Sequence, residues 1–388
     1  MPLNTFEDSG KRQKRITLFF LVVVSVAVLF FGLNPRAFSN HVEWIENQSG
    51  IRFSKDSIAY TNVFNGRIGG DFSDLKTFSV EIALKLEETY KDKFKFIFVL
   101  HNGQDRNQLL MAQWHSSIIL MNGDDYAHRR KTKRLVVDTA VLPTSTLFLT
   151  ITTNSHGTKL YFEDKLISEN KDLILDFPNH GKVMLVLGNS VYGENPWQGD
   201  IYGLAFYQSV LTSQDIKIHF AKWSNENNFS FAKNVRPFIL FPFDEKEGRW
   251  ASDISVGRHS LFIPKTMETL KKKFLRVPRK EMRFRTNFIV DIFLNILGFI
   301  PFGFLLSANL NDRSDIFRKY RVLITVGLCL MVSLIIEIIQ AWLPLRRSSL
   351  SDLLLNVFGG WIGSKIYLSW FRHLYDQLIG TLSRRLLS

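Results

Sequence analysis

Three pairs of side chains near the end of the sequence combine an acid with an amide one helical turn away. The pairs are Asp291 with Asn295, Glu337 with Gln340, and Asp352 with Asn356. Residues three or four apart lie on one face of a helix. All three pairs occur in apolar stretches, where a carboxylate at mid-membrane costs roughly 2.5 to 3.5 kcal/mol on insertion scales. Something must compensate that cost, so these residues are candidates for a shared polar site.

Four stretches are long and apolar enough to cross a membrane, which takes about 20 mostly apolar residues for roughly 30 Å of hydrocarbon. They are residues 16–33, 288–308, 322–344 and 350–370. The first contains no charged residue. It follows a basic start, as a secretory signal does, but it is long and no small-x-small cleavage site follows it. We expect four transmembrane helices, the first of them an uncleaved anchor.

The direction of these helices places the polar pairs at one depth. The pairs lie at the start of the second helix, in the last turns of the third and in the first turns of the fourth, so alternating helix direction brings them into one leaflet. Arg346 and Arg347 lie in the short loop beside them. This predicts a polar pocket in which Arg347 pairs with an anion. The alternatives are simple cross-linking of helices, at about 0.6 kcal/mol per hydrogen bond, and proton or ion chemistry.

Positive charges flank the predicted spans. The chain has 49 Lys and Arg against 36 Asp and Glu, a net charge of +13. A basic stripe on a soluble domain would indicate nucleic acid, but much of the positive excess lies at 11–15, 313–321 and 372–385. With the N-terminal segment 1–15 and the tail 371–388 in the cytoplasm, the positive-inside rule is satisfied. The segment between the first two helices then faces outward, and no nucleic-acid partner is expected.

A fourth basic cluster does not follow this rule. Residues 266–287, a predicted juxtamembrane linker, hold eight Lys and Arg between 271 and 285 on the side assigned as external. Such a segment either lies on anionic headgroups or binds an anionic polymer of the envelope. The single cysteine, Cys329, lies within the third predicted helix, which leaves no disulfide framework and no cysteine metal site.

Residues 50–265 have the pattern of an all-β sandwich. Short alternating or aromatic-rich runs, separated by Asn, Gly and Asp, occur at 77–86, 94–100, 116–122, 147–153, 159–167, 182–189 and 199–208. Residues 195–216 resemble the closing strand of laminin G and concanavalin A-like jellyrolls, which reads W-x-G-x-I and then L-[ST]-x-x-[DE]-I. Trp197, Gly199 and Ile201 match its first part. The resemblance implies a jellyroll fold.

Recognition is a better prediction than catalysis for this domain. Some glucanases of this architecture carry E-x-D-x-x-E on one strand, because alternate residues aim two carboxylates into one cleft; no such run occurs between 50 and 265. We expect binding of an envelope glycan or protein, with Trp114 and Tyr126 as candidate stacking residues. Asp124 and Asp125 are candidate Ca²⁺ ligands, or a solvated turn. No other cofactor is expected.

The strings at 291–306 and 333–363 resemble the VanZ-like family of small bacterial membrane proteins. Matching positions are Asp291, Asn295, Pro301, Gly303, Ser333, Glu337, Gln340, Arg347, Asp352, Asn356 and Gly359. The family takes its name from a gene associated with teicoplanin resistance. The resemblance covers residues 288–370 and implies a bacterial cytoplasmic-membrane protein whose first span, 16–33, precedes the inserted β domain.

Taken together, the sequence predicts a multi-domain membrane protein: an all-α four-helix transmembrane unit plus an all-β jellyroll sandwich. The expected ligand of the helical pocket is an envelope lipid or a glycopeptide-related headgroup, and membrane lipids are expected partners. An enzyme acting on a lipid-linked or phosphorylated substrate is the alternative, although no nucleophile is recognisable. A small transporter is a third possibility, for which four helices would need to form a homo-oligomer.

Overall fold

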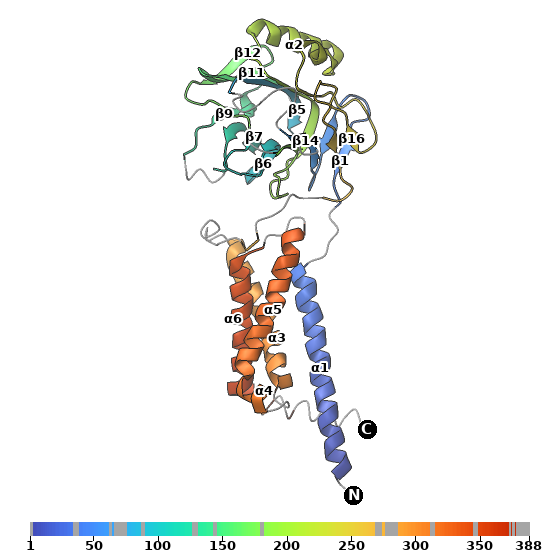
Figure 1. Cartoon of the computed structure of the whole chain (residues 1–388), viewed down its shortest axis with the longest axis vertical. Helices are drawn as coiled ribbons and strands as arrows, with labels where there is room; N and C mark the ends of the chain where they lie inside the picture. The colour runs from blue at the N-terminus through green and yellow to red at the C-terminus, as the bar shows by residue number, and fades with distance from the viewer. Residues whose placement is uncertain are drawn as a thin grey trace. The chain divides into compact units, whose positions relative to one another are not determined.

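The computed structural model describes residues 3–33, 39–61, 64–65, 76–86, 90–125, 131–142, 146–178, 182–267, 274–275, 286–310, 315–343, 348–371, 374 and 377. The chain divides into two compact units (Figure 1). Residues Met1–Arg36 and Lys271–Ser388 form a helical unit, and Ala37–Leu270 form a β unit. The β unit is thus inserted into the helical unit between its first two long helices.

The β unit is a sandwich of two antiparallel sheets, as the sequence predicts. The eight-stranded sheet has the order β1-β2-β14-β5-β10-β11-β12, with β15 beside β14. Its strands are β1 (Val42–Trp44), β2 (Ile51–Phe53), β5 (Phe78–Leu86), β10 (Thr146–Asn154), β11 (Gly157–Phe162), β12 (Lys165–Asn170), β14 (Gly199–Tyr207) and β15 (Ile239–Phe241). β1 lies before the predicted domain boundary at residue 50.

The nine-stranded sheet has the order β16-β17-β3-β13-β6-β7-β8-β9, with β4 beside β13. Its strands are β3 (Ala59–Thr61), β4 (Phe64–Asn65), β6 (Tyr90–His101), β7 (Leu109–His115), β8 (Ser117–Asn122), β9 (Leu135–Asp138), β13 (Lys182–Leu187), β16 (Trp250–Ala251) and β17 (Leu261–Phe262). A short 3-10 helix, η1 (Thr139–Val141), follows β9.

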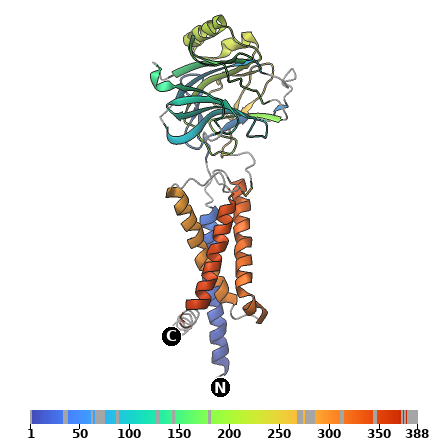
Figure 2. The ribbon, with the colours of Figure 1, turned by 90° about the vertical axis from the view of Figure 1, so that its left-hand side faces the viewer.

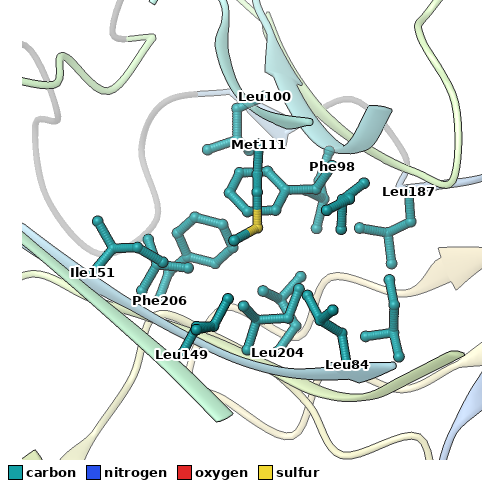
Figure 3. Packing of buried hydrophobic residues seen from close by; sticks show 14 of the residues in the cluster. Leu84, Phe98, Leu100, Met111, Leu149, Ile151, Leu187, Leu204 and Phe206 are labelled. Atoms are coloured by element: carbon teal, nitrogen blue, oxygen red, sulfur yellow. The ribbon is translucent and has the colours of Figure 1, made fainter. Parts of the chain in front are cut away.

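The core of the sandwich is formed by the alternate residues that each strand turns inward. Figure 3 shows Leu84, Leu149 and Phe206 of the eight-stranded sheet facing Phe98 and Met111 of the other. All five side chains are at most 1% exposed. Burying one such side chain stabilises the fold by roughly 1.5–3 kcal/mol, so this interior supplies the main stabilising contribution of the unit.

The other face of the eight-stranded sheet is covered by helix α2 (Ser213–Glu226) and the 3-10 helix η2 (Ser230–Val235), as Figure 1 shows for α2. α2 begins with a capping box, in which Thr212 and Asp215 exchange side-chain to backbone hydrogen bonds. Ile216 of the helix packs with the aromatic residues of the sheet in a second apolar cluster. The sheet is therefore buried on both faces.

The two ends of the β unit lie side by side. Ser39 and Thr266 form an antiparallel bridge. Next to it, the Asn40 side chain donates to the carbonyl oxygens of Ile58 and Pro264 and accepts from the Ile58 amide. One asparagine thus ties the first described segment of the unit to its last.

The helical unit contains α1 (Leu3–Leu33), α3 (Thr286–Leu310), the short α4 (Asp315–Lys319), α5 (Arg321–Trp342) and α6 (Leu350–Ile366), which continues as a π-helical turn, Tyr367–Phe371. The four long helices lie alongside one another in both views (Figures 1 and 2). Among the described residues, three segments are long and apolar enough to cross a membrane: Lys14–Leu33, Ile292–Leu310 and Arg321–Trp342. The chain is a membrane protein, and a fourth span over 350–370 remains a prediction.

α3 and α6 run parallel and approach closely at glycines. A Cβ atom at Gly359 or Gly363 would collide with the carbonyl oxygen of Ile296 or Ile300, and one at Gly303 would meet the Gly360 backbone. Small residues let membrane helices pack backbone to backbone. These contacts fix the register of the two helices.

Candidate functional site

Glu337 is a buried carboxylate at one end of the helical unit. It lies in the last turns of α5 and is 1% exposed. Its Oε2 atom accepts a hydrogen bond of 2.7 Å from the backbone N–H of Ser349, and the Ser348 side chain binds it as well. Ser349 is the N-cap residue of α6, and its own side chain makes no capping bond. Glu337 therefore caps α6 from the neighbouring helix.

This capping explains how the bundle tolerates the acid. The first N–H groups of a helix lack partners within the helix, and the aligned peptide dipoles make that end positive. A carboxylate placed there satisfies a donor and meets a favourable field. The cost of burying Glu337 is offset because its position on α5 places the carboxylate against the N-terminus of α6.

The other polar pairs contact neighbouring helices at the same end. Nδ2 of Asn356 donates to Oγ of Ser333 over 3.0 Å, which links α6 to α5. Nε2 of Gln340 donates to the carbonyl oxygen of Gly32 over 2.7 Å, which links α5 to the end of α1. Asp352 lies in the first turn of α6, where its charge acts on the Glu337 carboxyl group. These four residues lie near the end of α5 and the start of α6, and their contacts go mainly to neighbouring helices; that they form a pocket stays a prediction.

The remaining predicted pocket residues are placed less completely. Asn295 precedes Ile296, whose carbonyl oxygen packs against Gly359, so Asn295 lies within about a turn of Asn356 along the bundle. Asp291 belongs to α3, but its side chain falls outside the described residues. Arg347 also falls outside them. The arginine roof of the pocket therefore stays a prediction.

A second polar cluster at the opposite end of the bundle was not predicted. Oγ of Ser307 on α3 lies 3.1 Å from Oγ1 of Thr325 on α5 and donates to Oγ of Ser364 on α6 over 2.6 Å. One turn further, the Arg321 guanidinium lies over the ring of Tyr367, 5.8 Å from its centroid. The repeat of polar residues at every fourth position of α5 is the sequence signal that would have revealed this cluster.

The candidate ligand residues of the β unit are mostly engaged in the fold. Asp125 is 3% exposed and accepts from Nη2 of Arg134 at 2.8 Å and from the Thr132 amide at 3.1 Å. Its neighbour Asp124 is half-buried. Nowhere in the described parts of the chain do three or more His, Cys, Asp or Glu side chains come together as a metal site would require.

The aromatic candidates divide in the same way. Trp114 on β7 is half-buried with its ring 5.0 Å from that of His115. Tyr126 lies outside the described residues. Trp197 is fully buried, and its Nε1 donates to Oε1 of Gln113 over 2.9 Å, as expected of a core residue.

A buried polar trio attaches α2 to the sheet. Glu81 of β5 is fully buried; its carboxylate accepts from the Tyr207 hydroxyl at 2.6 Å and lies 2.9 Å from Nδ1 of His219. Burial and the negative charge of Glu81 raise the pKa of Tyr207 well above its ordinary value. Because all three side chains are at most 3% exposed, we assign them to holding the helix rather than to catalysis.

Comparisons with known proteins match the helical part of the chain. Residues 224–372 match the sequence model of the VanZ/LLP1 family. The match ends at residue 372, close to the end of the predicted region at residue 370, and it begins upstream of the predicted start at residue 288, within α2. Protein VanZ of Enterococcus faecium is 34% identical over 73 residues, which make up 19% of this chain and 41% of that protein. The match thus covers about two fifths of that relative.

Solved structures resemble part of the chain more distantly. A proposed carbohydrate binding protein from Bacteroides ovatus gives a TM-score of 0.39 at 15% identity, over 57% of this chain and 59% of that one. The receptor binding domain of a botulinum neurotoxin C/D mosaic gives 0.37 at 18% identity, over 47% and 45%. TM-scores this low carry no argument about function. The sequence matches carry the comparison: the chain is a membrane protein whose residues 224–372 match the VanZ/LLP1 family model.

Proposed function

We propose that the polar end of the helical unit binds the headgroup of an envelope lipid or of a glycopeptide-related molecule. The observation that supports this proposal is that Glu337, Gln340, Asp352 and Asn356 all lie near the end of α5 and the start of α6, where three of them make hydrogen bonds to neighbouring elements. Carboxylates and amides at one end of a bundle offer acceptors for the hydroxyl and amino groups of a headgroup. Arg347, if it lies above them, supplies a partner for phosphate.

The orientation that we propose places this end in the outer leaflet of a bacterial cytoplasmic membrane. Basic residues at 11–15, 313–321 and 372–385 favour a cytoplasmic location for both chain termini. The β unit is then extracytoplasmic, and we propose that it recognises an envelope glycan or protein. Its two adjacent ends fit an insertion that leaves the membrane after α1 and returns to the same side before α3; the side itself is proposed from the basic residues alone.

The binding proposal is tested by Glu337→Gln and Arg347→Ala in cells challenged with teicoplanin, with the amount of protein in the membrane measured in parallel. Both variants should shift the sensitivity of the cells relative to wild type. Asp315→Asn is the matched control, since Asp315 is exposed and pairs with Arg318 at the opposite end of the bundle. Unchanged sensitivity of both pocket variants at normal protein levels would remove the proposal.

The orientation is tested by a cysteine at the exposed Ser155 of the β unit, in a Cys329→Ser background. A membrane-impermeant thiol reagent should label Ser155→Cys in intact cells. In the same assay, labelling of Lys272→Cys shows on which side of the membrane the basic stretch lies. Labelling of Ser155→Cys only after lysis would put the β unit inside and the pocket in the inner leaflet.

A further inference from the structure

The face that α5 turns toward the other helices carries polar residues toward both ends, while Cys329 at its centre lies in an apolar cluster with Phe299, Phe302 and Leu306. Its side chains at every fourth position are at most 2% exposed: Arg321, Thr325, Cys329, Ser333 and Glu337. The opposite face is apolar and exposed, at 44–69%, through Leu323, Leu330, Met331, Ile335 and Ile338. A membrane helix with its polar residues inside is typical of a polar path through the bundle.

Each residue of this stripe meets a particular residue of α6, which runs antiparallel to α5. At one end Glu337 binds the Ser349 amide, and one turn along Ser333 binds Asn356. At the centre Cys329 contacts Gly360. Toward the other end Ser307 of α3 hydrogen-bonds to both Thr325 and Ser364, and the Arg321 guanidinium lies over the Tyr367 ring. We name these residues of α5 and α6, together with Ser307 of α3, the polar seam. It joins the two polar clusters described above into one feature.

The dimensions of the seam match those of a membrane. The 16 residue steps from Arg321 to Glu337 rise about 24 Å along the helix, most of the roughly 30 Å of hydrocarbon. Side chains four apart on a helix lie about 6 Å from one another, a gap that a single water molecule would have to bridge for a hydrogen-bonded chain to form. An acid stands at one end and a guanidinium at the other.

The seam is narrowest at its centre, which limits what could pass. A Cβ atom at Gly360 would collide with Sγ of Cys329, so thiol and glycine are in direct contact there. A hydrated metal ion or a lipid headgroup would need the helices to separate widely. A file of single waters needs a small displacement, and protons move along such a file from one hydrogen-bonding group to the next.

We propose that the polar seam is a proton path between the two ends of the bundle. Glu337 takes a proton from water at its end and passes it on. Each hydroxyl along the seam, with waters between them, accepts one proton and releases another, so no group changes its protonation state overall. The proton is released to water beyond Tyr367, and the contact between Cys329 and Gly360 closes the path at rest.

Charged residues of several elements belong to the end of the bundle that holds Glu337. α6 contributes Asp352, whose charge acts on Glu337, and α1 contacts this end through the Gly32 carbonyl. Asp291 of α3 and the loop residues Arg346 and Arg347 belong to this end by sequence, and their side chains lie outside the described residues. Arg321 at the other end carries a positive charge, which opposes protons as well as other cations and should slow release there.

The experiment uses the full chain in proteoliposomes that contain a pH-sensitive dye, with a potassium diffusion potential as the driving force. Cys329→Ala removes the side chain at the constriction and should raise the proton flux above that of wild type. Adding Glu337→Gln should return the flux to that of protein-free vesicles. The glutamine oxygen still accepts from the Ser349 amide, so the cap of α6 is kept.

Thr325→Val, which keeps the shape of the side chain and loses its hydroxyl, should reduce the flux of the Cys329→Ala protein. Ser25→Ala is the matched control, because Oγ of Ser25 bonds to the Leu21 carbonyl of its own helix, away from the seam. If neither wild type nor Cys329→Ala exceeds protein-free vesicles, the path does not exist and the seam only holds helices together. That result would leave headgroup binding, which is measured separately, untouched.

Discussion

Glu337 has two roles that different substitutions separate. As the cap of α6 it needs only an acceptor for the Ser349 amide, whereas as an acid it needs its charge. Glu337→Leu leaves two buried serines without their acceptor and should lower the stability of the helical unit by about 1–3 kcal/mol. Glu337→Gln should cost less.

Unfolding in detergent is followed with a thiol-reactive fluorogenic dye, because Cys329 is the single cysteine and is fully buried. Equal unfolding temperatures for Glu337→Leu and wild type would contradict the capping role.

Tyr207 is the strongest hydrogen-bond donor to the buried Glu81, at 2.6 Å. Tyr207→Phe should destabilise the β unit by about 1–3 kcal/mol, because the carboxylate loses a partner that water cannot replace. Tyr202→Phe is a suitable comparison: its hydroxyl makes a longer bond of 3.3 Å to Asp200, which Arg52 also binds. Thermal unfolding followed by near-ultraviolet circular dichroism measures both. A larger effect at Tyr202 would contradict this assignment.

At the level of elements, the approach of α3 to α6 depends on glycine. Gly363→Ala places a methyl group against the Ile300 carbonyl and should cost about 1–3 kcal/mol through overpacking. Gly298→Ala on α3 is the matched control, because nothing lies within 4 Å of the added Cβ; it should be neutral or stabilising. The same thiol-dye assay compares the two. Equal stability of both variants would show that the helices are not held at this contact.

The capping box of α2 gives the β unit a pH-dependent element. The hydroxyl and amide of Thr212 hold the pKa of Asp215 below its ordinary value. A depressed folded-state pKa adds stability above the unfolded pKa of about 3.9, and this stability is lost as the pH falls through the folded value. Asp215→Asn should therefore speed hydrogen exchange of the first-turn amides of α2 at pH 7. The difference from wild type should disappear below about pH 4. A difference that persists in acid would contradict the charge-based account.

The sequence predicted elements better than contacts between them. Alternating runs such as 147–153 located the long strands, whereas the two-residue strands β16 and β17 carry no periodic signal of their own. The trio of Glu81, Tyr207 and His219 joins residues 126 and 138 positions apart, and no local pattern reports such a contact. Helix direction predicts that the polar pairs of α5 and α6 lie near one end of the bundle, as the structure has them, whereas a ligand pocket formed by them stays a prediction. The polar residues at every fourth position of α5 are visible in the sequence too. Hydroxyl side chains are common inside membrane helices, however, so they indicate a functional site less strongly than acids do.

For the whole molecule, the division into two units predicts that the helical unit assembles without the inserted one. Replacing residues 40–265 by a short Gly and Ser linker should leave Cys329 as protected from thiol reagents as in the full chain, since the helices meet through their own contacts. The measurement is the rate of thiol modification in membranes. Rapid modification after the exchange would show that the bundle depends on the β unit.

The Asn40 clasp brings the entry and exit strands of the sandwich to neighbouring positions. A domain whose two ends lie side by side can be inserted into another protein with little change to the structure of that protein. A gene of this kind can therefore gain, lose or exchange the inserted module as a cassette while the segments that encode the helices stay intact.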